Sequence, residues 1–400
     1  MTVRGGIAQE PAARAGWGFD KLGVLIAGLS AYALLFAPLM TFRVNRIVPG
    51  EGRMLWDSLP AQAGLLFAVI VLAAPGPLLK TGPVVRLAAG IAALAALFVF
   101  AGMAGDHLTP ADDRLARVSP ASGFWLLLLA FALLLTDSLS RMTIPPLRRL
   151  ALLLGAALLL AGLLASGLWD SLSIMKEYRG RADSFRAEGV RHLTLAFGSM
   201  AAAVAAGIPL GMLCHRVQPA RVAVLNALNV IQTIPSIALF GLLIAPLGWL
   251  AANVPAAAAL GIRGIGMAPA FVALFLYSLL PVVANTVAGL AGVPQAVSDA
   301  ARGMGMTGGQ RLARVELPLA FPVMLTGIRI VLVQNIGLAT VAALIGGGGF
   351  GVFVFQGFGQ MAMDLVLLGA LPTVMLAFAS AIVLDALIEI SSVPKQGEAA

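Results

Sequence analysis

The stretch SDAARGMGMTGGQRLARVELPLA, residues 298–320, lies between two long apolar segments. It contains an acid-Ala-Ala triplet at 299–301, four glycines between 303 and 309, and the pair Leu317-Pro318. Glycines break helical regularity and let another backbone come close. A polar insert of this kind between two apolar segments is the feature that links the fold to the function.

Local signals predict a helix, a turn and a second helix in this insert. Ser298 is a suitable N-cap for a short helix that runs to about Met304. The letters QRLARVEL then resume a helix, and Pro318 opens the next apolar segment, where the first turn tolerates proline. We expect a stiff polar elbow that projects from the membrane, although these residues alone are equally compatible with an ordinary cytoplasmic loop.

Composition places the rest of the chain in a lipid bilayer. Of the 400 residues, 60% are hydrophobic and 11% are charged, and the mean hydropathy is +0.96. Soluble domains carry about 25% charged residues. Only helices and closed barrels satisfy their backbone in lipid, and continuous rather than alternating apolar runs argue against a barrel. We therefore predict an all-α polytopic membrane protein.

Apolar segments near the length of a membrane span define the expected organisation. There are ten, or eleven if the longest is broken at Pro235 or Pro246: 22–41, 61–79, 86–104, 122–136, 149–168, 193–213, 222–250, 266–289, 319–345 and 364–390. The charged stretch after residue 168 indicates a boundary. We expect an N-terminal transmembrane extension of about five spans at 1–185, a second unit of five to six spans at 186–392, and a C-terminal tail at 393–400.

Charge and cysteine content exclude several classes of function. The net charge of +8 is attributed to basic loops that set membrane topology and meet lipid headgroups, and no nucleic-acid partner is expected. The single cysteine, Cys214, rules out an intrachain disulfide and a cysteine-based zinc site. The three histidines are scattered, so no metal site is predicted.

The spacing within the insert resembles the signature of ABC importer permeases. That signature reads Glu-Ala-Ala, three residues, Gly, nine residues, Ile, one residue, Leu-Pro. Here Asp299-Ala300-Ala301 is followed by three residues and Gly305, and nine residues later by Val315, one residue and Leu317-Pro318. Asp replaces Glu, and Val replaces Ile.

Other stretches extend the resemblance over about residues 190–390. VIQTIPSIALFGLLIAPLG, LYSLLPVVANTVAG and IGGGGFG are similar to permease subunits of the osmoprotectant importers for glycine betaine, carnitine and choline. RIVPGEGRMLW and LSIMKEYRGR resemble a longer subgroup of glycine betaine uptake permeases that has an N-terminal multi-span extension.

The resemblance implies a type I, binding-protein-dependent permease domain in a bacterial inner membrane. The elbow at about 296–318 would be the coupling helix, which docks on a separate ATPase subunit that uses ATP and Mg. The other implied partners are an extracytoplasmic solute-binding protein, a second permease copy or a related permease, and membrane lipid. The implied coupling residues are Asp299, Ala300, Ala301, Arg302, Gly305, Val315, Leu317 and Pro318.

The chain itself has no G-x-x-x-x-G-K-[ST] phosphate loop and no catalytic constellation in its spans. It is therefore expected to be a transport subunit rather than an enzyme, with no cofactor of its own. Two alternatives stay open at this point: an ion-coupled secondary transporter, which would need membrane acids and inverted repeats, and a membrane scaffold that docks a soluble partner without transport.

Polar residues within the predicted spans have two interpretations. Several of them, spaced by three or four residues between 226 and 236, share one helical face. They either join helices by hydrogen bonds or line a solute path in which Pro235 frees backbone groups. The candidate path residues are Asn229, Gln232, Thr233, Pro235, Ser236, Asn285, Thr286, Arg329, Gln334 and Asn335.

Arg329 stands out among these, because it lies roughly 15 Å into its span. A charge at that depth usually faces a bundle interior or water. It is either a path or gate residue or a structural arginine bonded to helix-end carbonyls.

The glycine pattern Gly346-x-Gly348-x-x-Gly351 matches a dinucleotide-binding motif, but it follows an apolar helix instead of a strand. We predict a flexible structural turn at the outer end of a span. Quaternary ammonium groups are usually held by aromatic cages. The tryptophans lie near predicted span ends, as in an interfacial belt, so solute selection is expected in a separate binding protein.

Overall fold

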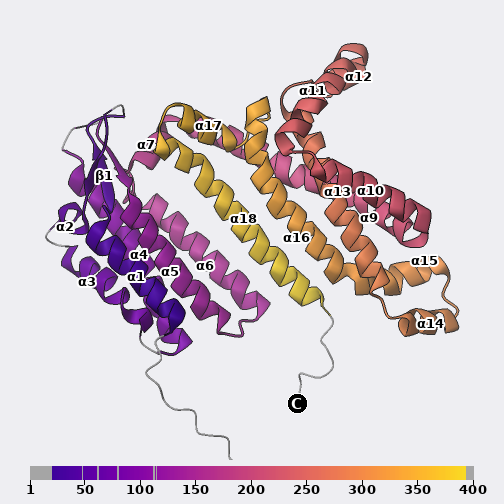
Figure 1. The fold of residues 1–400 in the computed structure, drawn as a ribbon, viewed down its shortest axis with the longest axis horizontal. Coiled ribbons are helices and arrows are strands. Elements are labelled where there is room, and N and C mark those ends of the chain that lie inside the picture. The colour runs from indigo at the N-terminus through magenta and orange to yellow at the C-terminus, as the bar shows by residue number, and fades with distance from the viewer. Residues whose placement is uncertain are drawn as a thin grey trace, which may run out of the picture. The chain divides into compact units, whose positions relative to one another are not determined.

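The computed structural model describes residues 20–46, 48–60, 63–78, 81–110, 113 and 115–392 (Figure 1). By contacts the chain divides into two compact units, Met1–Thr143 with Leu168–Leu172, and Ile144–Gly167 with Ser173–Ala400. This division differs from the predicted boundary at residue 185, because helix α6 (Pro146–Ala165) packs against helix α18 (Met363–Ser391) of the second unit. The predicted tail at 393–400 lies outside the described residues.

The first unit is a helical bundle with a small sheet. Its helices are α1 (Lys21–Phe36), α2 (Leu55–Ser58), α3 (Gly64–Ala73), α4 (Pro83–Leu108) and α5 (Ser122–Ser140), with the 3-10 turn η2 (Gly76–Leu78). Strands β1 (Met40–Arg43), β2 (Glu51–Arg53) and β3 (Arg117–Pro120) form an antiparallel sheet in the order β2-β1-β3. The sequence analysis did not anticipate this sheet, because its strands are only three or four residues long.

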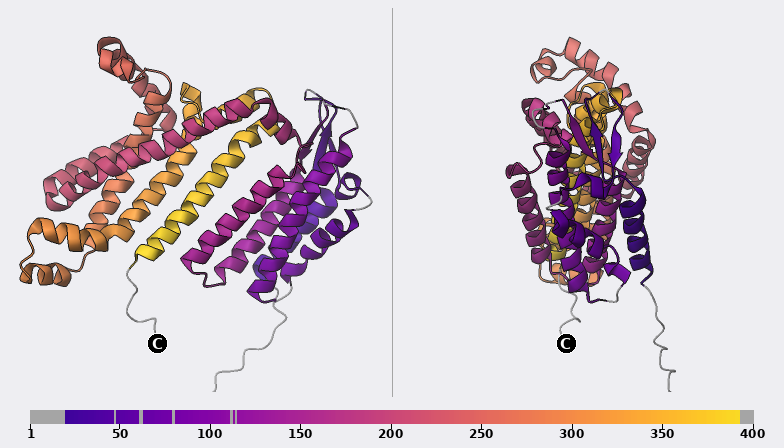
Figure 2. Two further views of the ribbon diagram at one scale, coloured as in Figure 1. Left: turned by 180° about the vertical axis from the view of Figure 1, so that it is seen from behind. Right: turned by 90° about the vertical axis from the view of Figure 1, so that its left-hand side faces the viewer.

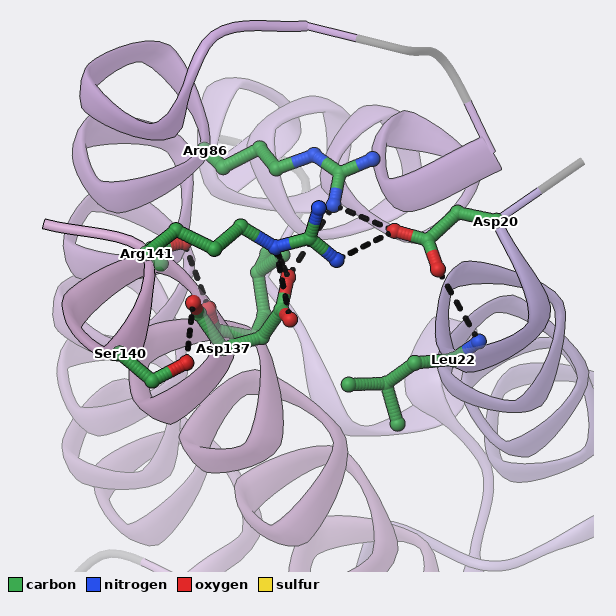
Figure 3. A network of polar contacts seen from close by, with 8 residues as sticks. Asp20, Leu22, Arg86, Asp137, Ser140 and Arg141 are labelled. Carbon is green, nitrogen blue, oxygen red and sulfur yellow. Dashed lines mark hydrogen bonds and ion pairs between the residues drawn. The ribbon is translucent and has the colours of Figure 1, made fainter.

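An ion-pair network joins three helix ends of this unit (Figure 3). Asp20 caps α1 by accepting a hydrogen bond from the Leu22 N–H, 3.2 Å away. Its other carboxylate oxygen lies 2.8 Å from Nη1 of Arg86 and 2.8 Å from Nη2 of Arg141. Asp137 pairs with the same two arginines, at 3.1 and 2.9 Å. The hydrogen bond from Arg86 holds the pKa of Asp20 below its usual value, and the two acids neutralise the buried Arg86 guanidinium.

The second unit centres on α13 (Met267–Ala291), which packs between α9 (Ser199–Arg216) and α16 (Leu317–Val341). Glycines permit the close approach. A Cβ at Gly211 of α9 would lie 2.6 Å from Cβ of Thr286, and one at Gly327 of α16 would lie 2.8 Å from Cβ of Asn285. Helix α16 in turn packs against α18, and the two helices run side by side (Figure 2).

Shorter elements complete the second unit. They are α7 (Ser173–Gly180), α8 (Ala182–Leu193), the π-helical turn η3 (Thr194–Gly198), α10 (Gln218–Thr233), α11 (Ser236–Asn253), α12 (Pro255–Ala259), the 3-10 turn η5 (Ala342–Ile345) and α17 (Gly351–Gly359). The apolar segment at 222–250 is broken at Pro235, between α10 and α11, because proline disfavours the helical conformation of the residue before it.

The predicted all-α membrane class is confirmed, although the described residues contain eight helices long and apolar enough to span a membrane instead of ten or eleven. The predicted spans at 22–41 and 61–79 correspond to α1 and α3, which are apolar but have only 16 and 10 residues. Hydropathy located both segments correctly. Their helices end early because β1 follows α1 closely and the η2 turn follows α3.

Candidate functional site

The elbow begins with helix α14 (Gln295–Gly303). Pro294 occupies the N-cap position. The prediction that Ser298 caps this helix is therefore wrong, and Ser298 lies inside the helix. At the other end, the Gly305 N–H donates to the Arg302 carbonyl at 3.0 Å, and the Met306 N–H donates to the Ala301 carbonyl at 3.2 Å. These two bonds form a Schellman motif, in which Gly305 adopts a left-handed φ of 80°. The glycine of the signature therefore terminates this helix.

The second arm is a helix that continues into the membrane. Thr307 and Gln310 form a capping box at the start of α15 (Gly308–Arg311). The π-helical turn η4 (Leu312–Glu316) follows, and α16 continues directly from it. Pro318 lies in the first turn of α16, as predicted. It cannot donate to the helical ladder, and the adjacent π-helical turn is where that ladder changes register.

One carboxylate joins the two arms of the elbow. Oε1 of Glu316 accepts a hydrogen bond from Oγ of Ser298 at 2.9 Å and from Nε of Arg311 at 2.7 Å. The Glu316 side chain is largely buried, so both bonds are shielded from water. Glu316 occupies the one position between Val315 and Leu317 that the signature leaves unspecified, and sequence analysis did not select it. Only its acidic character, close to Arg311, could have drawn attention to it.

The outer surface of α14 is apolar. Ala301 is buried, whereas Val297, Ala300 and Met304 are exposed, the last by 72%. Because Val297, Ala300 and Met304 are spaced by three and four residues, they form one strip along the helix, here called the α14 strip. No described residue of the chain covers it. The strip lies on a polar segment between two candidate spans.

The remaining predicted coupling residues are distributed over both arms of the elbow. Asp299 and Arg302 are exposed, with charged atoms 3.9 Å apart. Val315 and Leu317 are half-buried, and Pro318 is exposed. Leu317 packs against the cluster of Leu290, Ala320 and Met324, which anchors the elbow to α13 and α16.

Two predicted path residues are buried in helix contacts. Nδ2 of Asn335 donates to Oγ of Ser199 and to Oγ of Ser278, each at 2.9 Å, and thereby joins α16 to α9 and α13. The Asn335 side chain is fully buried. Thr286 is also fully buried, and its hydroxyl donates to the Val282 carbonyl of its own helix at 2.7 Å.

Gln232 joins α10 to α13 at a proline. Pro281 has no N–H to bond to the Tyr277 carbonyl, and Nε2 of Gln232 donates to that carbonyl at 2.8 Å instead. In return, the Tyr277 hydroxyl donates to the carbonyl of Ile234, beside Pro235, where the helix is interrupted. Two carbonyls near prolines are thus satisfied by side chains of the facing helix.

The polar face of α10 is open. Asn226, Asn229 and Thr233 are exposed, as is Pro235, while Ser236 is half-buried. These residues are here called the α10 polar face, and no described residue packs over them. Two further predicted path residues are half-buried: Gln334, and Asn285, whose Nδ2 donates to the Pro281 carbonyl at 2.8 Å.

Arg329 is paired with an acid. Its Nη1 lies 2.9 Å from Oδ1 of Asp385 on α18, and each side chain is 40% exposed. The ion-pair partner of Arg329 is therefore a carboxylate of the neighbouring span, and not a helix-end carbonyl as the structural interpretation expected. A second pair, Arg149 with Glu389 at 2.8 Å, holds α6 to α18 nearer the end of that helix.

The glycine-rich turn before α17 is packed. Gly347, Gly348 and Gly349 are buried, and the last two have φ of 77° and 87°. Oε2 of Glu188 accepts the Gly349 N–H at 2.6 Å, next to the N-terminus of α17. The turn leads from one helix to another, so the structure lacks the strand that a dinucleotide fingerprint requires here.

Comparison with known proteins agrees with this architecture. Residues 20–175 match the family described as ABC transporter permease YehY, N-terminal domain, and residues 207–392 match the family described as binding-protein-dependent transport system inner membrane component.

Two relatives each match about half of this chain. The osmoprotectant import permease protein OsmW of Salmonella typhimurium is 43% identical over 195 residues, which cover 49% of this chain and 84% of the relative. The glycine betaine/carnitine/choline transport system permease protein OpuCB of Bacillus subtilis is 35% identical over 186 residues, 46% of this chain and 78% of the relative. A solved structure of the MetNI methionine ABC transporter in an inward-facing conformation aligns with a TM-score of 0.46 and 21% identity, over 52% of this chain and 96% of that chain.

The chain therefore belongs to the osmoprotectant family of ABC importer permeases. Family membership and the eight apolar helices make it a multi-pass protein of the bacterial inner membrane.

Proposed function

We propose that this permease carries a small osmoprotectant, such as glycine betaine, choline or a related quaternary amine, across the inner membrane. The solutes after which its relatives are named support this solute class. ATP hydrolysis is supplied by a separate ATPase subunit that docks on the elbow. An extracytoplasmic binding protein selects the solute and delivers it to the outer face.

The observation that carries this proposal is the α14 strip on a braced elbow. An apolar strip that points away from its own chain, outside the apolar segments, is typical of a surface that a protein partner covers. The Glu316 hydrogen bonds and the Schellman motif hold the elbow in one conformation. A partner that moves the α14 strip therefore also moves α16, which continues directly from the second arm.

The α10 polar face supports a solute path formed with a second permease. Exposed amide groups beside apolar helices need partners other than lipid. A second copy of this chain, or a related permease, packed against α10 would enclose the face. Asn229 and Thr233 would then line the path, whereas Asn335 and Thr286 would hold the helices around it.

The ion-coupled alternative is less well supported by the site. A coupling acid must change its protonation or its cation during transport. Asp385, an acid within α18, is already paired with Arg329 at 2.9 Å, so it is not free to take up a coupling cation.

Substitution of Gly305 tests the docking role. The elbow should tolerate Gly305→Asn, because asparagine adopts the left-handed conformation more readily than other side chains. Gly305→Glu places a large charged group beside the α14 strip, where no neighbour lies within 4 Å of the added Cβ. We expect both variants to insert normally, with ATP-driven uptake into proteoliposomes abolished in Gly305→Glu and largely retained in Gly305→Asn.

Two measurements complete this test. Co-purification of the ATPase shows whether Gly305→Glu fails at docking, and vesicles without ATP define the background. Normal ATP-driven uptake by Gly305→Glu would contradict the proposal.

A further inference from the structure

The sheet of the first unit has one polar face. Strands β1 and β3 pair so that Thr41 faces Ser119 and Arg43 faces Arg117. Side chains alternate along a strand, so all four project from the same side. Directly opposed residues have Cβ atoms about 5 Å apart. Two arginines and two hydroxyl groups are thus brought together on one small surface.

This polar face has hydrogen-bonding groups without partners. Ser119 is only 9% exposed, and its buried Oγ has no hydrogen-bond partner among the described residues. The buried Nε of Arg43 likewise has none.

The chemistry that satisfies these groups is an oxyanion. Buried polar groups are normally hydrogen-bonded, and an unpaired one is unfavourable. Guanidinium groups donate to phosphate oxygens in a fixed planar geometry, and a serine hydroxyl adds one more donor. A phosphate group therefore fits the surface between Arg43 and Ser119 better than a neutral ligand does.

The position of the sheet along the chain points to a lipid as the source of that phosphate. β1 begins four residues after α1 ends at Phe36, and β3 ends two residues before the candidate span α5 begins. Residues this close to the end of an apolar helix lie at the level of lipid headgroups. Phe36 and Trp56 are exposed by 71% and 56%, and aromatic residues are common at that level.

An apolar groove starts at the same helix end. It has a volume of about 400 Å³ and lies between α1, α2, α3 and η2. Its lining includes Leu34 and Leu35 of the last turns of α1, and Leu55 and Trp56 of α2, which begins two residues after β2 ends. Phe67 and Val71 of α3 continue the lining along the helix. Such a surface suits an acyl chain and offers no polar group to a solute.

We propose that the first unit binds an anionic phospholipid, with the phosphate on Arg43 and Ser119 and one acyl chain in the apolar groove. The site lies wholly within the first unit and is independent of the transport pathway proposed above.

Thermal unfolding of the purified full-length permease in detergent tests the proposal. Phosphatidylglycerol should raise the unfolding temperature, because a ligand stabilises the state that binds it. Phosphatidylcholine should raise it less, because the choline cation offsets the charge of its phosphate. Arg43→Gln should weaken phosphatidylglycerol binding by about fivefold or more, the effect of one arginine near an anionic lipid surface. Arg263→Gln, at an exposed arginine of the second unit, serves as the control and should bind as the unaltered chain does.

Ser119→Ala gives a second reading that does not depend on charge. The buried Ser119 hydroxyl has no partner among the described residues, and such a group is unfavourable. Its removal should therefore leave the lipid-free unfolding temperature unchanged or higher, while reducing the stabilisation by phosphatidylglycerol. A serine that serves only the fold would show the reverse pattern.

Inorganic phosphate separates the two sources of the anion. If phosphate alone produces the same shift in unfolding temperature and Arg43→Gln abolishes that shift, the oxyanion site exists. Its ligand is then soluble phosphate and not a lipid. If phosphatidylglycerol and phosphate both leave the unfolding temperature unchanged, or if Arg43→Gln and Ser119→Ala respond as the Arg263→Gln control does, the site does not exist.

Discussion

Two glycine-rich stretches of the second unit use glycine in opposite ways. In the elbow, an added Cβ at Gly303, Gly305, Gly308 or Gly309 meets nothing within 4 Å. In the turn before α17, an added Cβ at Gly348 would lie 2.7 Å from the Arg191 side chain, and one at Gly351 would overlap the Thr340 carbonyl oxygen.

The difference shows what each glycine is needed for. In the turn before α17, glycine is required because the chain's own atoms occupy the space. In the elbow the space is empty, so only Gly305 has a local reason to be glycine, its left-handed φ. Under the proposed function, the open space over the other elbow glycines belongs to the docked ATPase. Substitutions should therefore destabilise the turn and spare the folded state of the elbow.

The largest expected effect is that of Gly351→Ala. Its methyl group has no room beside Thr340, so the backbone must shift, and we expect a loss of about 3 kcal/mol in the free energy of unfolding. Gly309→Ala is the matched change in the elbow, and it should stabilise the chain by up to about 1 kcal/mol, because alanine is the better helix former. Denaturant unfolding of the two purified variants measures both changes in the free energy of unfolding. Equal losses of stability in the two variants would contradict the distinction between the two stretches.

A smaller effect is expected from Glu316→Ala. The change leaves Ser298 and Arg311 without their shared acceptor, and we expect about 1.5–3 kcal/mol of local stability to be lost in the elbow. Hydrogen exchange of residues 295–316 should increase, and ATP-driven uptake should fall. Asp299→Asn is the control for hydrogen exchange alone, because its pair with Arg302 is exposed and 3.9 Å long, and such pairs contribute little to stability. Unchanged exchange in Glu316→Ala would show that other contacts brace the elbow.

The smallest effect should follow from Glu188→Gln at the turn before α17. The amide still accepts the Gly349 N–H, but the charge that favours the bond at a helix N-terminus is lost, so about 1 kcal/mol of stability should disappear. Docking of the ATPase on the elbow should be unaffected. A loss of ATPase co-purification in this variant would mean that the two stretches are coupled and do not act separately.

The spans and the elbow were predictable because their signals are local. Hydropathy placed every long helix, and the signature spacing marked the elbow. The contacts that give each residue its place are not local: Ser298 and Glu316 are 18 positions apart, and Asn335 bonds residues 57 and 136 positions away.

The same limit explains the uncertain roles of the polar residues. Asn229 and Asn335 are both amides within apolar surroundings, yet one is exposed and the other is fully buried. Periodicity shows which residues share a face of one helix, but it cannot say which neighbour that face meets. The paired strands of the first unit were missed for the same reason.

The Asn335 junction has a consequence for how the importer opens and closes. Sliding α9, α13 or α16 past one another would break hydrogen bonds in a site that water cannot reach. These three helices should therefore travel together as one rigid body during the transport cycle. The hinge must lie elsewhere, and α10 with α11 is the natural place, because a proline interrupts the pair. Among the described residues, two side-chain hydrogen bonds, those of Gln232 and Tyr277, tie the interruption to α13.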